Sequence, residues 1–154
     1  MSSATELQED TIKNEVDILA LVITRMNSSD KRATIREMFN YIKTTQVFKP
    51  LFLFGHDPQI EENLSEILEE SQKYKDLIVP NVEDNYHTVA LKLLSAFHWI
   101  GSLGSTRLKW IIKMDDDVYI NVTKFDEYFL NSNRSQKDFH CYETYTEPVR
   151  NPNR

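Results

Sequence analysis

The sequence predicts an α/β fold, in which a mostly parallel β-sheet is covered by helices on both faces. Short apolar runs alternate four times with segments of helical spacing, at intervals of about 30 residues. The chain has 154 residues, the length of one ordinary domain. Apolar residues make up 40% and charged residues 27%, which is typical of a globular protein.

The first strand is expected over residues 16–23, where a nearly continuous run of branched apolar residues indicates burial on both faces. Residues 1–15 are polar and aperiodic, so we expect a disordered lead-in there. Cap residues at 28–30 and apolar residues spaced from Ile35 to Ile42 predict the first helix.

The second strand is expected over residues 50–54 and is closed by Gly55. Pro58 can open the next helix, because its fixed φ suits the first helical position. Apolar residues from Ile60 to Leu68 share one face of that helix, with glutamates on the other. A short third strand is expected over residues 77–79.

The apolar spacing from Val89 to Ile100 predicts a long helix that ends near one of two glycines. A fourth strand follows over residues 108–114, and a helix capped by Asn121 over residues 122–131. We therefore expect one α/β domain, residues 16–135, and a loop-like tail, residues 136–154. Since the chain stops in a loop while the sheet is still open, we expect the domain to be truncated.

The charge and targeting signals limit the classes of partner. The 18 basic and 24 acidic residues give a net charge of −6, which argues against nucleic acid or an anionic membrane surface as the main partner. No apolar run approaches the length of a membrane span, and the first residues lack the features of a signal peptide. Four glycosylation sequons nevertheless favour a secretory lumen: they start at Asn27, Asn63, Asn121 and Asn133.

The acidic triplet Asp115-Asp116-Asp117 is the sharpest feature of the sequence, because it directly follows an apolar strand. Ligands of open α/β sheets bind beyond the carboxyl ends of the strands. In extended backbone Asp115 and Asp117 would project to the same side and Asp116 away from them. Three carboxylates together call for a hard cation such as Mg²⁺ or Mn²⁺. The alternative is a solvated acidic turn between a strand and a helix.

Two further pairs are candidates for a phosphate site. Arg32 and Arg36 share one helix face and could bind phosphates, although a basic surface helix is the better explanation of the pair taken alone. Asp84 and Lys92 bracket the start of the long helix, where the alternatives are a helix cap and an exposed lysine. The sequence contains no glycine-rich dinucleotide loop, no P-loop and no serine-hydrolase elbow.

Five segments, in order and at similar spacing, resemble the β-1,3-galactosyltransferase family. Residues 32–39 resemble its R-x-A-I-R-x-T-W block, and residues 113–121 resemble K-x-D-D-D-V-F-V-N. Residues 52–55 match a strand that ends in F-L-L-G. Residues 70–78 and 84–92 resemble E-x-x-x-Y-x-D-I-L and D-x-Y-x-N-L-T-L-K. The resemblance implies the Rossmann-like GT-A fold, of which this chain would hold the N-terminal part.

The family resemblance also implies a site. A UDP-sugar donor would be held through Mn²⁺, or Mg²⁺, by a D-x-D motif in which Asp117 and Asp115 bind the metal. The residues expected near the donor are Arg32, Arg36, Asp84, Lys92, Asp115 and Asp116. The catalytic base is expected in the C-terminal half of the family domain, and so has no candidate here.

The implied activity is inverting transfer of galactose or an N-acetylhexosamine from a UDP-sugar to a glycan hydroxyl. The acceptor would be a glycoprotein or a glycolipid, with a β-1,3 linkage, in protein glycosylation. The implied location is the lumenal side of the Golgi membrane, reached through an anchor that this chain lacks. One alternative is an inactive fragment that binds UDP and metal. A metal-dependent phosphohydrolase fits poorly, because its aspartates usually follow the first strand.

Overall fold

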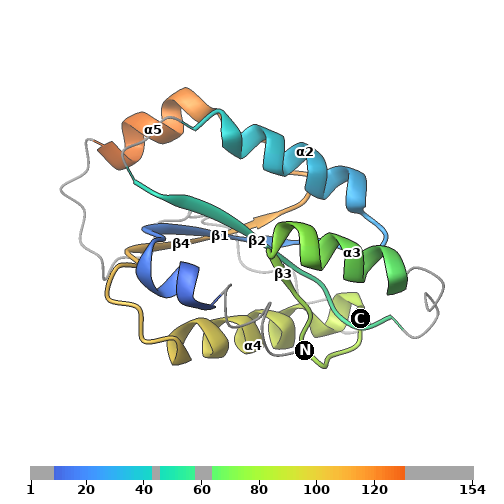
Figure 1. Cartoon of the computed structure of the whole chain (residues 1–154). Coiled ribbons are helices and arrows are strands. Elements are labelled where there is room, and N and C mark those ends of the chain that lie inside the picture. Colours follow the sequence, from blue (N-terminus) through green and yellow to red (C-terminus); the bar gives the residue numbers. More distant parts are fainter. Residues whose placement is uncertain (1–8, 43–45, 58–63, 131–154) are drawn as a thin grey trace, which may run out of the picture.

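A computed structural model describes residues 9–42, 46–57 and 64–130 of the chain. Its four strands form one sheet in the order β3-β2-β1-β4, and every neighbouring pair is parallel (Figure 1). The strands are β1 (Ile18–Ile23), β2 (Phe48–Leu53), β3 (Leu77–Ile78) and β4 (Trp110–Asp115). The predicted parallel α/β sheet is thereby confirmed.

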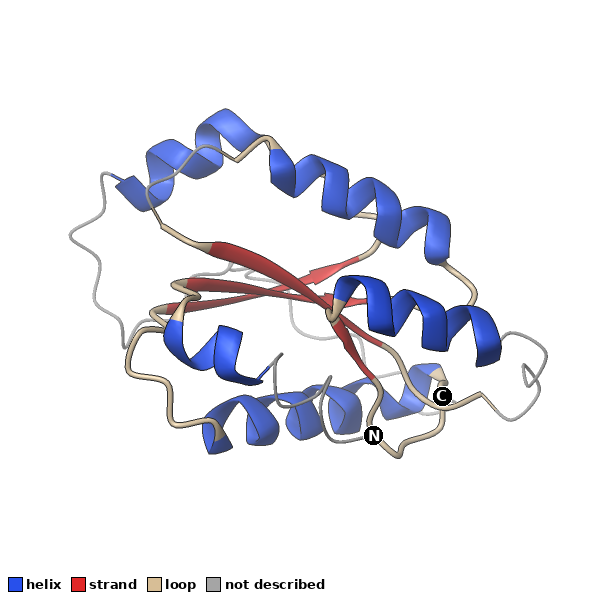
Figure 2. Cartoon of the chain, in the orientation of Figure 1, coloured by secondary structure: helices blue, strands red, loops and turns tan. Residues whose placement is uncertain are grey.

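Helices cover both faces of this sheet (Figure 2). One face carries α2 (Ser29–Asn40), α3 (Leu64–Tyr74) and α5 (Val122–Leu130). The other face carries α4 (Val89–Ser102), which follows the short 3-10 helix η2 (Tyr86–Thr88), and a helical segment over residues 9–14. No helix in the described ranges combines the length and the apolar content that crossing a membrane would require.

Strand β1 forms the centre of two hydrophobic cores, because its successive side chains point to opposite faces of the sheet. Ala20 and Val22 lie in the core beneath α2 and α3. Leu19 and Leu21 lie in the core that faces α4. The strand is buried over nearly its whole length, as its continuous apolar run predicts.

The predicted disordered lead-in is wrong for the last part of residues 1–15. Residues 9–14 are helical, and Ile12 is fully buried in the core that faces α4. Trp99 Nε1 donates to Glu9 Oε1 at 3.2 Å, and Ser105 Oγ donates to the carbonyl of Lys13 at 2.7 Å. A single buried isoleucine produces no periodic signal, which is why the sequence pattern missed this segment. Residues 1–8 lie outside the described part.

The strand and helix boundaries shift by a few residues from those expected. Strand β2 starts at Phe48 and so includes Pro50. Proline has no N–H to donate to a neighbouring strand. The pairing of β2 with β3 begins only at Phe52, so it needs no donor from Pro50. The predicted cap of α5 is confirmed, since the amide of Lys124 donates to Asn121 Oδ1 at 3.1 Å. The expected helix start at 58–63 lies outside the described residues, as does everything after residue 130.

Asp17 ties three strands together at the amino edge of the sheet. Its carboxylate accepts the amide of Val47 at 2.9 Å, directly before β2. Arg107 and Lys109, before β4, bind the same carboxylate at 3.1 and 3.2 Å. Burial raises the pKa of Asp17, but the amide and the two basic side chains outweigh it. Its pKa therefore lies below the ordinary value of 3.8.

Candidate functional site at the carboxyl edge of the sheet

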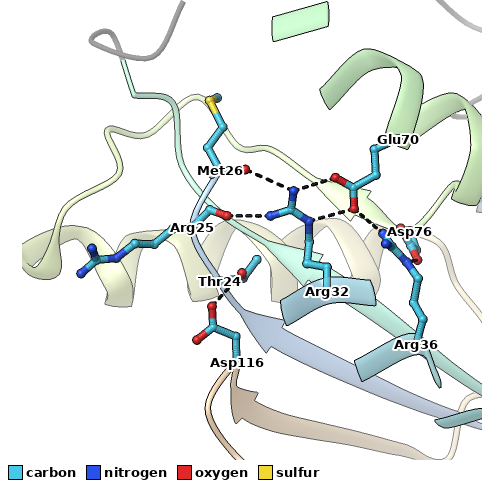
Figure 3. Close-up of polar contacts among 8 residues, drawn as sticks. All are labelled: Thr24, Arg25, Met26, Arg32, Arg36, Glu70, Asp76 and Asp116. Atoms are coloured by element: carbon cyan, nitrogen blue, oxygen red, sulfur yellow. Dashed lines mark hydrogen bonds and ion pairs between the residues drawn. The ribbon is translucent and has the colours of Figure 1, made fainter. Parts of the chain in front are cut away.

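The strand order reverses between β1 and β4, and this is where open α/β sheets bind their ligands. Thr24, the residue after β1, donates from Oγ1 to Asp116 Oδ2 at 2.9 Å (Figure 3). Lys31 Nζ, in the first turn of α2, lies 2.8 Å from Asp116 Oδ1. The middle carboxylate of the acidic triplet is therefore held at the carboxyl ends of β1 and β4, where the strand order reverses.

The other two carboxylates of the triplet are exposed. Asp115 binds Lys113 Nζ at 2.8 Å, and Asp117 faces solvent. The predicted alternation, with Asp115 and Asp117 on one side and Asp116 away from them, assumed an extended backbone through the triplet, and that assumption is wrong. The extended backbone ends at Asp115, because the chain turns there and the amide of Val118 donates to the Asp115 carbonyl at 3.3 Å. The alternation of side chains along a strand therefore does not extend through the triplet.

The chemistry of the triplet fits a hard divalent cation, but the triplet does not form a complete cage. Carboxylate oxygens are the ligands that Mg²⁺ and Mn²⁺ prefer. Within the described residues no three His, Cys, Asp or Glu side chains converge closely enough to hold a metal ion. Any cation bound here would need further ligands from water or a phosphate group, which is usual for Mg²⁺.

Asp84 and Lys92 form a buried ion pair beyond the ends of β2 and β3. Lys92 Nζ donates to Asp84 Oδ1, and the two side chains are 4% and 9% exposed. The alternative that Lys92 is merely exposed is therefore wrong. The cap of η2 comes from Asn85, whose Oδ1 accepts the amide of Thr88 at 3.1 Å.

Gly55 allows the segment that carries Asp84 to approach β2. The amide of His56 donates to the Val82 carbonyl at 2.8 Å, and the amide of Asp84 donates to the His56 carbonyl at 2.9 Å. A Cβ on Gly55 would lie 2.5 Å from that Val82 oxygen and 2.8 Å from the Asp84 nitrogen. A glycine at this position is thus a requirement of the close backbone contact.

Arg32 and Arg36 are engaged inside the protein (Figure 3). Arg32 is fully buried and donates to both carboxylate oxygens of Glu70, at 2.9 and 2.6 Å. Arg36 binds Asp76 at 2.7 and 2.8 Å and Glu70 at 2.7 Å. Its guanidinium also lies 3.9 Å from the ring centre of Tyr74. Direct contact with a diphosphate would require several of these charge-assisted bonds to break.

The electrostatics of this network favour its charged forms. Burial raises the pKa of Glu70, but hydrogen bonds from Arg32 and Arg36 outweigh it, so the pKa falls below its ordinary value of 4.5. Burial lowers the pKa of Arg36, but the hydrogen bonds to Asp76 and Glu70 more than reverse this, so its pKa rises above the ordinary value of an arginine. Glu70 and Arg36 therefore stay charged at neutral pH.

A pocket of about 350 Å³ lies elsewhere on the described surface, between α2 and α3. Its walls include Asn27, Asp30, Arg36 and Glu70. Neither the acidic triplet nor the Asp84–Lys92 pair lines it, so this pocket is separate from the crevice between β1 and β4.

Sequence reasoning did not single out Thr24, Lys31, Glu70 or Asp76. Thr24 could have been found, because it follows a buried strand at the predicted edge. Glu70 and Asp76 fall inside one of the segments that carry the family resemblance. Their pairing with the arginines spans 34–40 residues of sequence, and no local pattern reports such a contact.

The sheet topology defines the class of the protein: an open α/β fold whose strand order reverses between β1 and β4. A family model for galactosyltransferases matches residues 30–153, and the chain belongs to this family. The chain is 30% identical over 105 residues to beta-1,3-galactosyltransferase 4 of Mus musculus. It is 30% identical over 129 residues to UDP-GalNAc:beta-1,3-N-acetylgalactosaminyltransferase 1 of Rattus norvegicus, and 31% identical over 115 residues to beta-1,3-galactosyltransferase 1 of Homo sapiens.

The three matches cover 68%, 81% and 71% of this chain. They cover 28%, 39% and 34% of the respective relatives, so the chain spans about a third of the length of these proteins.

Proposed function

We propose that this chain forms the donor-binding part of a hexosyltransferase. The donor is a UDP-sugar carrying galactose or N-acetylgalactosamine, and the acceptor is a glycan hydroxyl on a glycoprotein or glycolipid. The linkage is β-1,3, the reaction inverts the anomeric centre, and it takes place on the lumenal side of the Golgi membrane. The names of the relatives support the choice of sugar and the β-1,3 linkage. Inversion and the Golgi location rest on the resemblance of the sequence motifs to the family.

One observation carries the proposal. The hydrogen bond between Thr24 and Asp116 brings the acidic triplet to the point where the strand order reverses. A family whose relatives use nucleotide-sugar donors would need a nucleotide site there. The carboxylates of the triplet would repel an anionic diphosphate by themselves, so they fit such a donor only through a bound divalent cation.

A divalent cation, Mn²⁺ or Mg²⁺, would be held by Asp115 and Asp117. When bound, it would neutralise charge on the departing diphosphate. Asp116 would stay anchored to Thr24 beside the donor, and its second oxygen faces Lys31. Asp84 and Lys92 would lie at the same edge of the sheet, beyond β2 and β3. Their buried ion pair would hold the segment at Asp84, which also binds the backbone of His56 after β2.

The test is a calorimetric titration of UDP into the purified chain, with and without Mn²⁺, beside Asp117→Ala. Binding that needs Mn²⁺ and is lost in the variant is the expected result. Asp10→Ala is the matched control, because it removes an exposed carboxylate from the helical segment on the opposite face. Absence of Mn²⁺-dependent binding by the folded wild-type chain would overturn the proposal.

A second candidate is a protein that binds UDP and metal without transferring a sugar. The residues proposed for the donor could bind UDP and metal whether or not a sugar is then transferred. Incubation with UDP-galactose or UDP-N-acetylgalactosamine and a glycan acceptor separates the two. A glycosylated product supports the transferase, whereas UDP binding without product supports the second candidate.

A further inference from the structure

Arg32 makes an unusual set of contacts for a residue near a phosphate site. Its side chain has no solvent exposure, although it lies in the first turns of α2. In addition to Glu70, it donates from Nη1 to the carbonyl of Arg25 at 2.6 Å and from Nη2 to that of Met26 at 3.1 Å. Four of its five N–H donors are therefore bound to the protein.

The two carbonyls belong to the connection between β1 and α2. This connection begins with Thr24, the residue whose hydroxyl holds Asp116. Arg32 thus binds the two residues that directly follow Thr24, and it anchors them through Glu70 to helix α3 (Figure 3). Arg32 is therefore connected to the acidic triplet through the backbone of residues 24–26 and the hydrogen bond from Thr24 to Asp116.

Arg36 offers a natural comparison. It lies one helical turn further along α2 and binds the same Glu70. Its other hydrogen-bond partner is Asp76, directly before β3. Neither Glu70 nor Asp76 belongs to the β1–α2 connection. The two arginines therefore share a role in stabilising the packing of α2 on α3, but they differ in their contact with the candidate site.

We propose that Arg32 is a positioning residue, which holds the β1–α2 connection so that Thr24 keeps Asp116 at the crevice. It does so from inside the protein and without touching the donor. The expected effect on donor binding rests on the proposed function. The expected effect on the β1–α2 connection does not.

Lysine cannot replace arginine in this position. The planar guanidinium directs its donors along a fixed fork, so one group can bind a carboxylate and two carbonyls at once. A lysine keeps the charge beside Glu70 but presents one compact ammonium. In Arg32→Lys the connection should lose at least one of its two carbonyl contacts.

The experiment compares Arg32→Lys with Arg36→Lys by amide hydrogen exchange on the whole chain. Both variants should lower the melting temperature by similar amounts. In Arg32→Lys alone we expect faster exchange at Ser28, whose amide donates to the Arg25 carbonyl, and at Val118 in the turn of the triplet. Mn²⁺-dependent UDP affinity should fall about three- to tenfold in Arg32→Lys, the loss expected for one hydrogen bond, and stay near wild type in Arg36→Lys.

Two results would overturn the inference. Loss of UDP binding in Arg32→Lys with unchanged exchange would make Arg32 a direct donor ligand. Equal increases in exchange for both variants would show that Arg32 contributes only to the general stability of the fold. If the wild type binds no UDP, the proposed function fails, and the exchange comparison still decides the positioning role.

A milder variant covers the case in which Arg32→Lys does not fold. Glu70→Gln keeps the size of the side chain but weakens the anchor of Arg32 on α3. It should increase exchange at Ser28 and Val118 by a smaller amount, and unchanged exchange there would contradict the inference.

Discussion

Lys92 and Asp84 form an ion pair that is almost completely removed from solvent, with side chains 4% and 9% exposed. Removal of one partner from such a pair leaves an uncompensated buried charge, which costs about 3–5 kcal/mol. We expect Lys92→Met to destabilise the chain by this amount in urea denaturation. The double variant Asp84→Asn/Lys92→Met should recover most of the loss, because no buried charge is then left alone.

The exposed pair Lys124–Glu127 provides the control for this prediction. Its side chains are 74% and 54% exposed, so Lys124→Met should change the stability little. A double variant at Asp84 and Lys92 that is no more stable than Lys92→Met would contradict the prediction.

Gly55 is expected to tolerate no side chain. The Cβ of an alanine would meet backbone atoms of Val82 and Asp84 at 2.5–2.9 Å, and backbone cannot rotate away as a side chain can. Gly55→Ala should therefore destabilise the fold by about 1–3 kcal/mol and displace the segment that carries Asp84. Thermal unfolding measures the first effect.

The matched substitution is Gly101→Ala. Gly101 lies inside α4, and a Cβ there would meet open space. Because alanine is the better helix former, this variant should stabilise the chain by about 0.5–1 kcal/mol. A Gly55→Ala variant as stable as the wild type would contradict the close contact at Gly55.

The pH dependence of stability follows from two carboxylates whose pKa values lie below their ordinary values, Glu70 and Asp17. In each case the unfolded chain binds a proton more readily than the folded one. Their contribution to stability is therefore complete above the ordinary values of 4.5 and 3.8, and it is lost as pH falls through the lower folded values. Urea denaturation between pH 7 and pH 3 should show a flat region and then a decline.

Asp17→Asn tests the assignment, because an amide does not titrate. The variant should be less stable than the wild type at neutral pH, and the difference should shrink towards pH 3. A difference that stays constant with pH would remove Asp17 as a cause of the acid-induced loss.

Most of the fold could be predicted because the signals are local. The buried run of β1 and the apolar spacing of α4 each report their own element. The segment 9–14 was missed because its core contact depends on one residue, Ile12, which packs against elements far along the chain. Tertiary contacts of this kind decide the structure where the local pattern is weak.

The candidate site was predictable in its location and less so in its contacts. An apolar strand followed by the acidic triplet placed the carboxylates at the correct edge. The orientation of Asp116 could not be derived, because it depends on a turn and on a hydroxyl 92 residues earlier. The internal role of Arg32 was hidden for the same reason, since Glu70 lies 38 residues away.

The burial of Arg32 has a consequence for how related sequences are interpreted. The arginines, Glu70 and Asp76 account for two of the segments by which this chain resembles its family, and their contacts hold helices and strands together. A chain that had lost its chemistry but kept its shape would retain all four residues. Those segments therefore report ancestry and architecture, and they are no evidence that a member still transfers sugar.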